Sequence, residues 1–357
     1  MQRERLLNMN LYLDNGYVDI RSIRESGYPF IFMWGGRGIG KTYGVIDDVI
    51  NNGDKMIFAR RTQTMADIVF TDAMNPFKRW NNDHGRTFAF ESVAKGVQGI
   101  YEFAKKNGSF MKLPGGQPIG YTAALSTFSH IRGIDASDVS LFFLDEFIKE
   151  PHEAGGFLAG AFFDAYETIA RNRELEGAPP LQFIGASNAY NILNDFFIEL
   201  EIVHDAYLMQ KKNQSVKEFK DRGLLLIRFT DSPISAAKSD TALYKLAKNT
   251  KYGEMALNNN FATYDYPIKS RRLNEYSPIV SIGEITIYIH KSRSELYVSP
   301  HRAGECPKLT TGKEDMRIFA EKYRQLLRQM ILTDSIIYED YISAALLNRW
   351  CFEKNPA

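Results

Sequence analysis

Eight consecutive residues, 35–42, have the types and spacing of a phosphate-binding loop. They read Gly-Gly-Arg-Gly-Ile-Gly-Lys-Thr and match the pattern G-x-x-x-x-G-K-[ST]. Glycines let backbone N–H groups converge on phosphate oxygens, and the N-terminus of a following helix adds positive potential. In this motif the lysine reaches the β- and γ-phosphates, and the Ser/Thr hydroxyl holds Mg²⁺. The predicted ATP contacts are Gly35, Gly36, Arg37, Gly38, Ile39, Gly40, Lys41 and Thr42.

A second candidate feature is the acidic pair Asp145-Glu146, which directly follows the mostly apolar run 139–144. Such a run is typical of a Walker B strand, in which the Asp coordinates Mg²⁺ directly or through water. The adjacent Glu146 would polarise the attacking water as a general base. An Asp at a strand end is also common in ordinary turns, but the loop at 35–42 favours the metal-binding interpretation. The predicted cofactors are therefore ATP and Mg²⁺, and the predicted activity is ATP hydrolysis.

Three further positions could complete this chemistry. Asn188 follows the apolar run 181–186 and could sense the γ-phosphate or hold the water, although Asn is also common in turns. Arg171 ends the predicted helix 156–171, where the helix dipole alone favours a cation. The alternative for Arg171 is an arginine finger given to the ATP of a neighbouring subunit. Arg132 precedes the acidic strand and could contact nucleotide, subunit or DNA.

The elements that would position these residues form an α/β pattern. A predicted strand at 30–34, a helix at 42–50 and a strand at 55–59 make a βαβ unit, which implies a parallel sheet. Arg60 and Arg61 follow the second strand. Each could contact nucleotide, a neighbouring subunit or DNA, with a solvated surface position as the default, and we take both as candidate DNA contacts. Further strands are predicted at 86–90, 99–103, 120–125, 181–186 and 224–229.

The pattern of predicted helices and strands changes after residue 231. The stretch 235–251 is predicted to be helical, 278–299 an antiparallel meander, and 315–332 and 338–350 two helices. We therefore predict a P-loop ATPase domain at 1–231 with a central, mostly parallel sheet. A helical linker at 232–264 and a small α+β domain at 265–357 follow.

Composition limits the possible partners. The 357 residues include 44 Lys and Arg against 43 Asp and Glu, a net charge of +1, which excludes a generally basic surface. Residues 202–272 hold 13 basic and 7 acidic residues, a local excess of six, with Lys211 and Lys212 as candidate DNA contacts.

Two cysteines exclude a disulfide framework and a Cys-based zinc site. No signal peptide or membrane-spanning run is expected.

Taken in order, these blocks resemble the DNA-packaging ATPases of small tailed phages. The resemblance rests on Gly-Gly-Arg-Gly-Ile-Gly-Lys-Thr, Arg60-Arg61, Phe-Leu-Asp-Glu-Phe-Ile, Arg-Asn-Arg at 171–173 and Ser-Asn-Ala at 187–189. A segment resembling their domain linker follows at 252–257, so the likeness covers about residues 30–262. It implies an additional-strand ATPase domain, a helical linker and a domain similar to a vestigial ribonuclease-H-like nuclease.

The resemblance also implies partners and roles. Such motors assemble as a ring, typically a pentamer, on the portal of an empty capsid in the host cytoplasm. They pump double-stranded DNA, and some dock on a structural RNA; no membrane partner is implied. Arg171 and Arg132 match positions that the family uses in trans, and Asn188 matches its coupling motif. The family segment after the second strand is more basic and aromatic than 62–65 here, so Arg60 or Arg61 would supply any DNA contact there.

Three alternatives stay open at this point: a terminase large subunit with an active nuclease, another P-loop NTPase such as a helicase-like or partition ATPase, and a non-enzymatic module. No helicase motif set accompanies the two Walker motifs, and the intact catalytic residues make a non-enzymatic module a poor fit. An active nuclease needs several carboxylates converging on two metals. The acidic residues of the tail form no strand-centred pair of that kind: Glu275, Glu284, Glu295 and Asp315.

Overall fold

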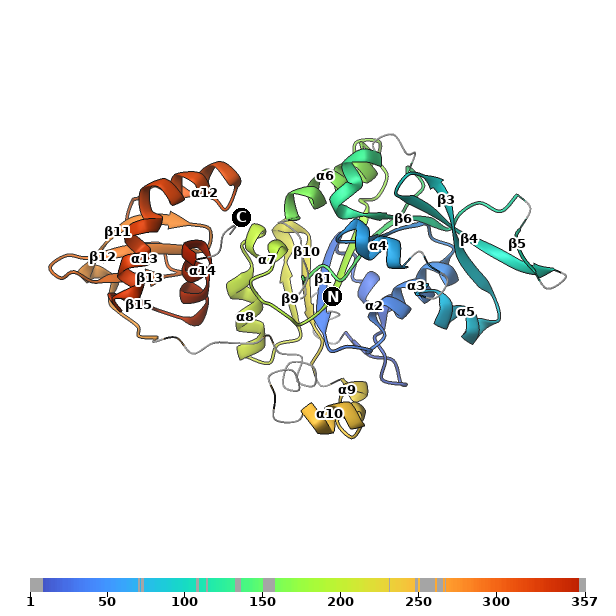
Figure 1. Cartoon of the computed structure of the whole chain (residues 1–357), viewed down its shortest axis with the longest axis horizontal. Coiled ribbons are helices and arrows are strands. Elements are labelled where there is room, and N and C mark those ends of the chain that lie inside the picture. Colours follow the sequence, from blue (N-terminus) through green and yellow to red (C-terminus); the bar gives the residue numbers. More distant parts are fainter. Residues whose placement is uncertain are drawn as a thin grey trace. The chain divides into compact units, whose positions relative to one another are not determined.

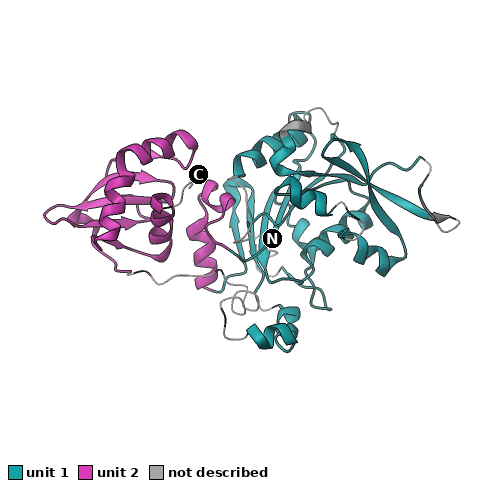
Figure 2. Cartoon of the chain, viewed as in Figure 1, with its two compact units in different colours: residues 1–190, 213–260 teal, residues 191–212, 261–357 magenta. Residues whose placement is uncertain are grey.

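A computed structural model of the chain describes residues 9–69, 71, 74–106, 109–113, 115–131, 136–149, 158–230, 232–247, 250, 261, 266 and 268–352. The chain forms two units, shown in Figure 2: residues 1–190 with 213–260, and residues 191–212 with 261–357. This division differs from the boundaries expected from the sequence. It includes the expected linker up to residue 260 in the first unit, and it assigns 191–212 to the second.

The first unit is built around a ten-stranded sheet (Figure 1). Along its main path the order is β3-β4-β6-β2-β7-β8-β1-β10-β9, and β5 pairs with β4. The six strands from β6 to β10 on this path are parallel, and the outer strands are antiparallel, so the predicted mostly parallel sheet is confirmed. The strands are β1 Phe30–Gly35, β2 Met56–Arg60, β3 Thr87–Ala94, β4 Val97–Lys106, β5 Ser109–Lys112, β6 Gly120–Ala124, β7 Leu141–Asp145, β8 Gln182–Asn188, β9 Val216–Phe219 and β10 Leu224–Arg228.

Strand order decides which chain segments meet at the carboxyl edge of this sheet. β8 lies between β1 and β7, which is the additional strand that the resemblance implied. Gly35 at the end of β1 pairs in register with Asn188, and Asp145 at the end of β7 pairs with Ala186. The predicted phosphate loop, acidic pair and sensor therefore start from neighbouring strand ends.

Helices cover both faces of the sheet because its central strands are apolar on both sides. On one face, Ile31 and Met33 of β1 join a core with residues of α2, α3 and α5. On the other face, Phe32 packs against Phe162 of α6, with ring centroids 6.4 Å apart. The helices of this unit are α2 Ile20–Arg24, α3 Lys41–Asn52, α4 Gln63–Val69, α5 Lys78–His84, α6 Ala159–Ala170, α9 Pro233–Lys238 and α10 Ala242–Ala247.

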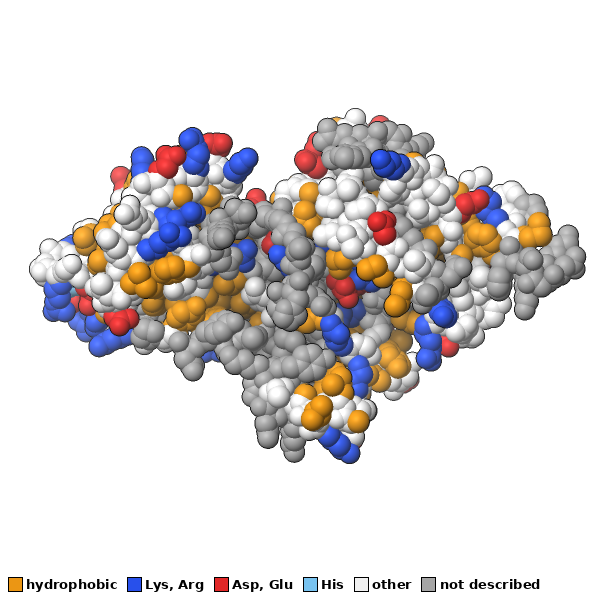
Figure 3. Space-filling view, viewed as in Figure 1, with side chains coloured by type: hydrophobic (Ala, Val, Ile, Leu, Met, Phe, Trp, Pro, Cys, Tyr) orange, Lys and Arg blue, Asp and Glu red, His pale blue; other side chains and the backbone are white. Residues whose placement is uncertain are grey.

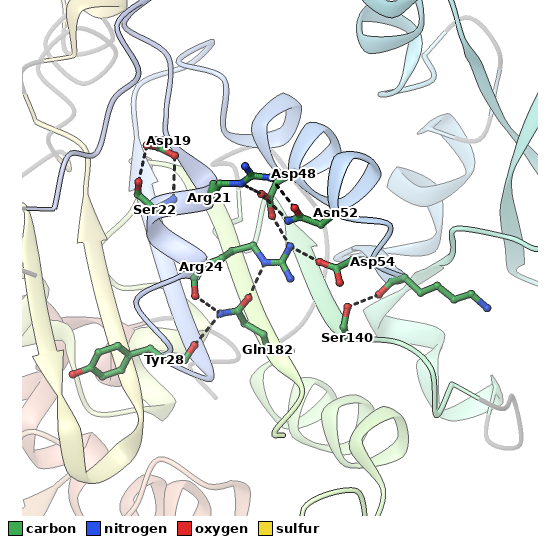
Figure 4. Close-up of polar contacts among 11 residues, drawn as sticks. Asp19, Arg21, Ser22, Arg24, Tyr28, Asp48, Asn52, Asp54, Ser140 and Gln182 are labelled. Atoms are coloured by element: carbon green, nitrogen blue, oxygen red, sulfur yellow. Dashed lines mark hydrogen bonds and ion pairs between the residues drawn. The ribbon is translucent and has the colours of Figure 1, made fainter. Parts of the chain in front are cut away.

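Helix α2 is fastened by a polar network that centres on Arg24 (Figure 4). The Arg24 guanidinium contacts Asp48 Oδ2 at 2.5 Å and Asp54 Oδ2 at 2.8 Å, and its Nε donates to Gln182 Oε1 at 2.8 Å. Its side chain is 14% exposed, so water screens these contacts only partly. The network ties the N-terminal segment to the end of α3 and the start of β8.

The helix predicted over 235–251 is two short helices within its described part, α9 and α10. Hydroxyl side chains separate them: Ser239 Oγ donates to the Ala236 carbonyl at 2.7 Å, and Thr241 Oγ1 to the Lys238 carbonyl at 2.8 Å. Such bonds compete with continuation of a helix. Apolar and basic side chains lie together over these helices (Figure 3), and Leu243 and Leu246 of α10 are exposed.

The second unit contains a five-stranded sheet in the order β14-β11-β12-β13-β15. β11, β12 and β13 form the predicted antiparallel meander, while β14 and β15 are short parallel strands at its two edges. The strands are β11 Tyr276–Ile282, β12 Ile285–His290, β13 Leu296–Ser299, β14 Lys308–Leu309 and β15 Ile336–Tyr338. The last predicted helix therefore begins after Tyr338, since that residue ends a strand.

The helices of the second unit include two that the sequence patterns missed, α7 and α8. The predicted helix 315–332 is α12, a π-helical turn at Ala320–Arg324, and α13 in succession. The bounds are α7 Asp195–Glu199, α8 Val203–Lys211, α12 Lys313–Phe319, α13 Gln325–Leu332 and α14 Tyr341–Phe352. In the described part of the chain, no helix is long and apolar enough to cross a membrane.

His204 explains why α8 belongs with the second unit. Its Nδ1 lies 3.2 Å from Glu284 Oε1 and its Nε2 lies 3.2 Å from Asp340 Oδ2. Burial alone would lower the pKa of His204, but hydrogen bonds and charges of Asp340 and Glu284 outweigh it and raise the pKa to about 9. Glu284 also accepts the backbone N–H groups of Val203 and His204 at 2.9 and 3.0 Å. A charged histidine and a capped helix start thus hold α8 to β12 and α14.

Candidate nucleotide-binding site

The loop 35–42 joins the end of β1 to the start of α3. Gly38 and Gly40 have φ values of 68° and 93°, in the left-handed region that favours glycine. A Cβ atom on Gly40 would lie 2.9 Å from Tyr17 Cδ1, so the loop is also tightly packed there. The sequence places glycine where the backbone turns sharply toward the first N–H groups of α3, which is the arrangement that binds phosphate.

Lys41 is buried at the bottom of this loop, with 8% of its surface exposed. Its Nζ donates to the carbonyls of Gly36 and Gly35 at 2.8 and 3.4 Å, and to Asn188 Oδ1 at 3.3 Å. Burial lowers the pKa of Lys41 to about 7, although the charges of Asp145 and Glu146 partly oppose this shift. An anionic phosphate beside Lys41 would favour its charged form.

Thr42 and Asp145 meet where a divalent cation would bind. Thr42 Oγ1 donates to the two carboxylate oxygens of Asp145 at 3.0 and 3.2 Å. Asp145 is 3% exposed and lies at the carboxyl end of β7. A hydroxyl and a carboxylate are the hard oxygen ligands that Mg²⁺ prefers, together with phosphate oxygens and water. These two residues therefore fit the predicted magnesium site.

Of the roles that the sequence left open for Arg60, the structure favours a position beside the acidic pair. It ends β2, the strand beside β7, and its guanidinium contacts Asp145 Oδ2 at 2.9 Å and Glu146 Oε2 at 2.6 Å. Its side chain is only 14% exposed. Arg60 is therefore part of the nucleotide site, and this position argues against the predicted role as a DNA contact.

Arg61 is also turned inward rather than toward a partner. It is 1% exposed, and its Nη1 donates to the Phe147 carbonyl at 2.7 Å. A buried guanidinium that holds the backbone after β7 cannot also lie on DNA phosphates. This burial corrects the prediction of a DNA contact at Arg61. Arg228, which was counted in the basic stretch 202–272, is likewise 3% exposed and does not contribute to a surface patch.

Glu146 is held in an uncommon backbone conformation directly beside Asp145. Its φ is 61°, and its N–H donates to the Ala186 carbonyl at 2.7 Å. A non-glycine residue with positive φ costs of the order of 1 to 3 kcal/mol, and such residues concentrate at functional sites. The side chain is 33% exposed, so it borders the cavity rather than the core. This conformation directs the chain away from the strand immediately after the carboxylate pair.

Asn188, at the end of β8, completes the set through its contact with Lys41. Near it, Arg37 Nε donates to the Tyr190 hydroxyl at 2.8 Å, and the guanidinium carbon lies 5.5 Å from the centre of the Tyr190 ring. This pairing links the loop to the segment after β8. Tyr190 was not predicted, because a lone tyrosine after a strand carries no sequence signal for such a contact.

An open cavity of about 1020 Å³ lies at this edge of the sheet. The cavity brings together most of the residues predicted to bind nucleotide: Arg37, Gly38, Gly40, Lys41, Thr42, Asp145, Glu146 and Asn188. It also includes residues of the N-terminal segment and of α2, such as Tyr17 and Arg21, which the sequence analysis did not assign.

Arg171 lies at the opposite edge of the sheet. Arg171 directly follows α6, the helix that returns from the carboxyl edge of the sheet after β7. Two residues further along, Arg173 Nη2 donates to the Val139 carbonyl at 2.8 Å. Val139 precedes β7, and six residues of extended chain to Asp145 would span roughly 20 Å. Arg171 is thus far from the carboxylate pair of its own subunit.

The other predicted contacts lie elsewhere. Arg132 is outside the described residues. Lys211 and Lys212 form the exposed end of α8 in the second unit. The structure therefore keeps the predicted ATP and Mg²⁺ residues together, separates Arg171 from them within one subunit, and moves Arg60 into the site.

Comparison with known proteins identifies a family of similar sequences. The sequence model of the family described as Podovirus DNA encapsidation protein (Gp16) matches residues 25–318. The DNA packaging protein of Bacillus phage PZA is 26% identical over 259 residues, which cover 70% of this chain and 68% of the relative. That of Bacillus phage B103 is 27% identical over 280 residues, covering 75% and 76%.

Two solved structures share the fold. The bacteriophage Phi-29 viral genome packaging motor assembly superposes with a TM-score of 0.60 at 19% identity, over 96% of this chain and 100% of that chain. The Phi-28 gp11 DNA packaging motor gives a TM-score of 0.56 at 18% identity, over 95% and 97%. The family match spans most of the sequence and includes the phosphate loop, the acidic pair and Asn188. By that match the chain belongs to the podovirus DNA encapsidation (Gp16) family.

Proposed function

We propose that this chain is the ATP-hydrolysing motor that drives double-stranded viral DNA into a preformed capsid. The observation that carries the proposal is the convergence of Lys41, Thr42, Asp145 and Glu146 on one cavity. Family membership supports the coupling of this site to DNA packaging. The motor would work as a ring of identical subunits, expected to be a pentamer, docked on the capsid portal in the host cytoplasm.

The side chains of the site have separable tasks. Lys41 would bind the β- and γ-phosphate oxygens in place of the loop carbonyls that it contacts here. Thr42 and Asp145 would hold Mg²⁺, which neutralises charge that builds on the phosphates. Glu146 would accept a proton from the attacking water, and Asn188 would lie beside the γ-phosphate.

Arg60 contacts the two acidic residues that this chemistry needs. In the structure its guanidinium contacts both carboxylates of the acidic pair. It engages one oxygen of each, Asp145 Oδ2 and Glu146 Oε2. A carboxylate has about four acceptor positions, so both residues keep positions for a cation or a water while Arg60 orients them.

Packaging must not depend on DNA sequence, so contacts with phosphates suffice. The exposed lysines Lys211 and Lys212, with other basic residues of 202–272, are our candidates for such contacts. The same surface could dock on a structural RNA at the portal. We also propose that residues 265–357 form the nucleic-acid- or portal-binding domain and that this domain has a ribonuclease-H-like ancestry.

A terminase with an active nuclease is the second candidate, and side-chain contacts in the tail argue against it. Glu284 holds the start of α8, Glu295 accepts a hydrogen bond from Tyr276, and Asp315 accepts from Thr310 at 2.7 Å. Within the described ranges, no three His, Cys, Asp or Glu residues are grouped so that they could hold a metal. The observed carboxylates stabilise helix starts and loops instead.

The experiment that tests the motor function measures ATP hydrolysis with purified full-length protein. We expect strong stimulation by empty capsids together with linear double-stranded DNA, and much weaker stimulation by DNA alone, because the ring assembles on the portal. DNA alone giving the full stimulated rate would favour a helicase-like or partition ATPase. Metal-dependent cutting of the DNA in the same reactions would favour the nuclease.

A prediction for the general base follows from the position of Glu146. Glu146→Gln keeps the size of the side chain but removes the proton acceptor, so we expect ATP binding to persist while hydrolysis falls by roughly 10² to 10⁴. Equilibrium binding of a fluorescent ATP analogue and single-turnover hydrolysis measure the two quantities separately. Glu314→Gln, at an exposed position of α12, is the matched control and should behave as wild type. A parallel loss of binding and turnover would assign Glu146 to nucleotide binding.

A further inference from the structure

The nucleotide cavity extends well beyond the Walker residues. Besides Asp145, Glu146 and Asn188, its lining includes a wall formed by residues between Leu13 and Ser22 of the N-terminal segment. The family match begins at residue 25, so this wall lies ahead of the part of the chain that the family model covers. The cavity is therefore partly built by residues to which neither the motifs nor the family assigns a task.

The N-terminal wall is fixed to the phosphate loop by backbone contacts. Val18 N–H donates to the Ile39 carbonyl inside the loop at 3.0 Å. Tyr12 and Val18 form an antiparallel bridge, and Leu13 N–H donates to the Tyr17 carbonyl at 2.8 Å, which closes a tight turn. Beyond it, Arg24 anchors α2 to α3, as Figure 4 shows. These contacts hold the turn in a defined place beside the loop.

Tyr17 presents an aromatic ring from this turn. Its ring lies against Gly40, since a Cβ on that glycine would be 2.9 Å from Tyr17 Cδ1, and 44% of the residue is exposed. The other aromatic residue that borders the cavity, Tyr43, packs against the core and donates its hydroxyl to Asp83 at 3.1 Å. Of the two aromatic residues among the described residues that line this cavity, Tyr17 is thus the more exposed, since Tyr43 is partly buried.

The direction of a bound nucleotide follows from the Walker residues. Asp145, Glu146 and Asn188 mark the γ-phosphate end, while the loop and the first turn of α3 bind the α- and β-phosphates. The base must therefore extend away from the carboxylates, toward the start of α3 and the N-terminal turn. Aromatic side chains stack on nucleic-acid bases of every kind because each base has a π-face.

We propose that Tyr17 forms the base-binding wall of the nucleotide site by stacking on the base of ATP. The inference rests on the proposed ATPase function and adds a subsite to it. Stacking on Tyr17 would contribute to affinity for the whole nucleotide and not to affinity for its phosphates. It would discriminate little between adenine and guanine, since neither a ring face nor its stacking reads base edges.

The test compares two ligands on full-length protein by isothermal titration: ATP, which has a base, and inorganic tripolyphosphate, which has none. For Tyr17→Ala we expect ATP affinity to fall roughly five- to a hundredfold, the range for loss of one aromatic stack. Tripolyphosphate affinity should stay within twofold of wild type. Tyr17→Phe and Tyr17→Trp keep an aromatic face and should retain ATP affinity, and GTP should follow ATP in every variant.

Two results would overturn the inference. Equal losses for ATP and tripolyphosphate would mean that Tyr17 only shapes the loop through Gly40, and unchanged ATP affinity in Tyr17→Ala would mean that the base lies elsewhere. If Tyr17→Ala does not fold, a loss of ATP affinity in Tyr17→Phe would count against stacking. Wild-type protein that binds neither ligand would refute the proposed ATPase function instead, so the two failures can be told apart.

Discussion

Lys41→Ala is expected to abolish ATP turnover while the protein stays folded. The ammonium contacts loop carbonyls and Asn188, and Lys41 is not among the residues of the apolar core. Removing it deletes the cation that meets the β- and γ-phosphates, where charge grows during hydrolysis. A single preorganised donor to developing charge is worth roughly 10² to 10³ in rate, and the loss of phosphate binding adds to this. Turnover should therefore fall to background.

Steady-state hydrolysis and thermal unfolding, measured on the same preparation, check this prediction. Asp145→Ala should also be inactive, because Thr42 alone cannot hold Mg²⁺. Lys55→Ala is the control: it removes a more exposed lysine, whose side chain is 25% exposed, from a surface ion pair with Asp138. Exposed pairs contribute little, so its activity should be unchanged. Near-normal ATPase in Lys41→Ala or Asp145→Ala would contradict the enzyme assignment itself.

Arg171→Ala is expected to lose turnover by roughly 10³ to 10⁵, the value of an arginine finger. Charge builds on the γ-phosphate in the transition state, and a guanidinium can donate to two of its oxygens at once. Arg171 lies at the edge of the sheet opposite to Asp145, as the contact of Arg173 with Val139 shows. We therefore propose that Arg171 completes the site of a neighbouring subunit rather than its own.

Mixing experiments test whether Arg171 acts in the active site of its own subunit or in that of a neighbouring subunit. Arg171→Ala subunits should be inactive alone, and so should Glu146→Gln subunits. Mixed rings should regain part of the ATPase activity, because a site with an intact Glu146 can then receive Arg171 from its neighbour. Supplying the arginine in trans also makes hydrolysis in each subunit depend on the adjacent subunit. This dependence suits sequential ATP hydrolysis around a ring.

The neighbouring arginine provides the control. Arg173 donates to the carbonyls of Val139 and Ser137 at 2.8 and 3.3 Å, so Arg173→Ala should lower the unfolding temperature without a pattern of rescue on mixing. Mixed rings that assemble but never recover activity would place Arg171 in its own subunit or at the end of α6 as a structural residue. Arg132, the other arginine predicted to act in trans, can be tested in the same way.

The sequence alone determined the local chemistry of the site. The spacing of 35–42 specified a phosphate loop, and the apolar run before Asp145 specified a buried strand with a carboxylate at its end. The central strands were predictable within about two residues, because they are short apolar runs bounded by turn residues. The antiparallel meander of the second unit was predictable for the same reason. Each of these features depends only on residues that are neighbours in the chain.

Tertiary structure decided which distant residues share a surface. Arg60 and Arg61 look alike in sequence, yet one contacts the carboxylate pair and the other is buried, because β2 lies beside β7. Helix α8 joins the second unit through His204, although it lies between two strands of the first. The turn with Tyr17 borders the nucleotide cavity only because Val18 bonds to the loop. Such contacts follow from strand order and long-range packing, which residue periodicity in a single sequence does not encode.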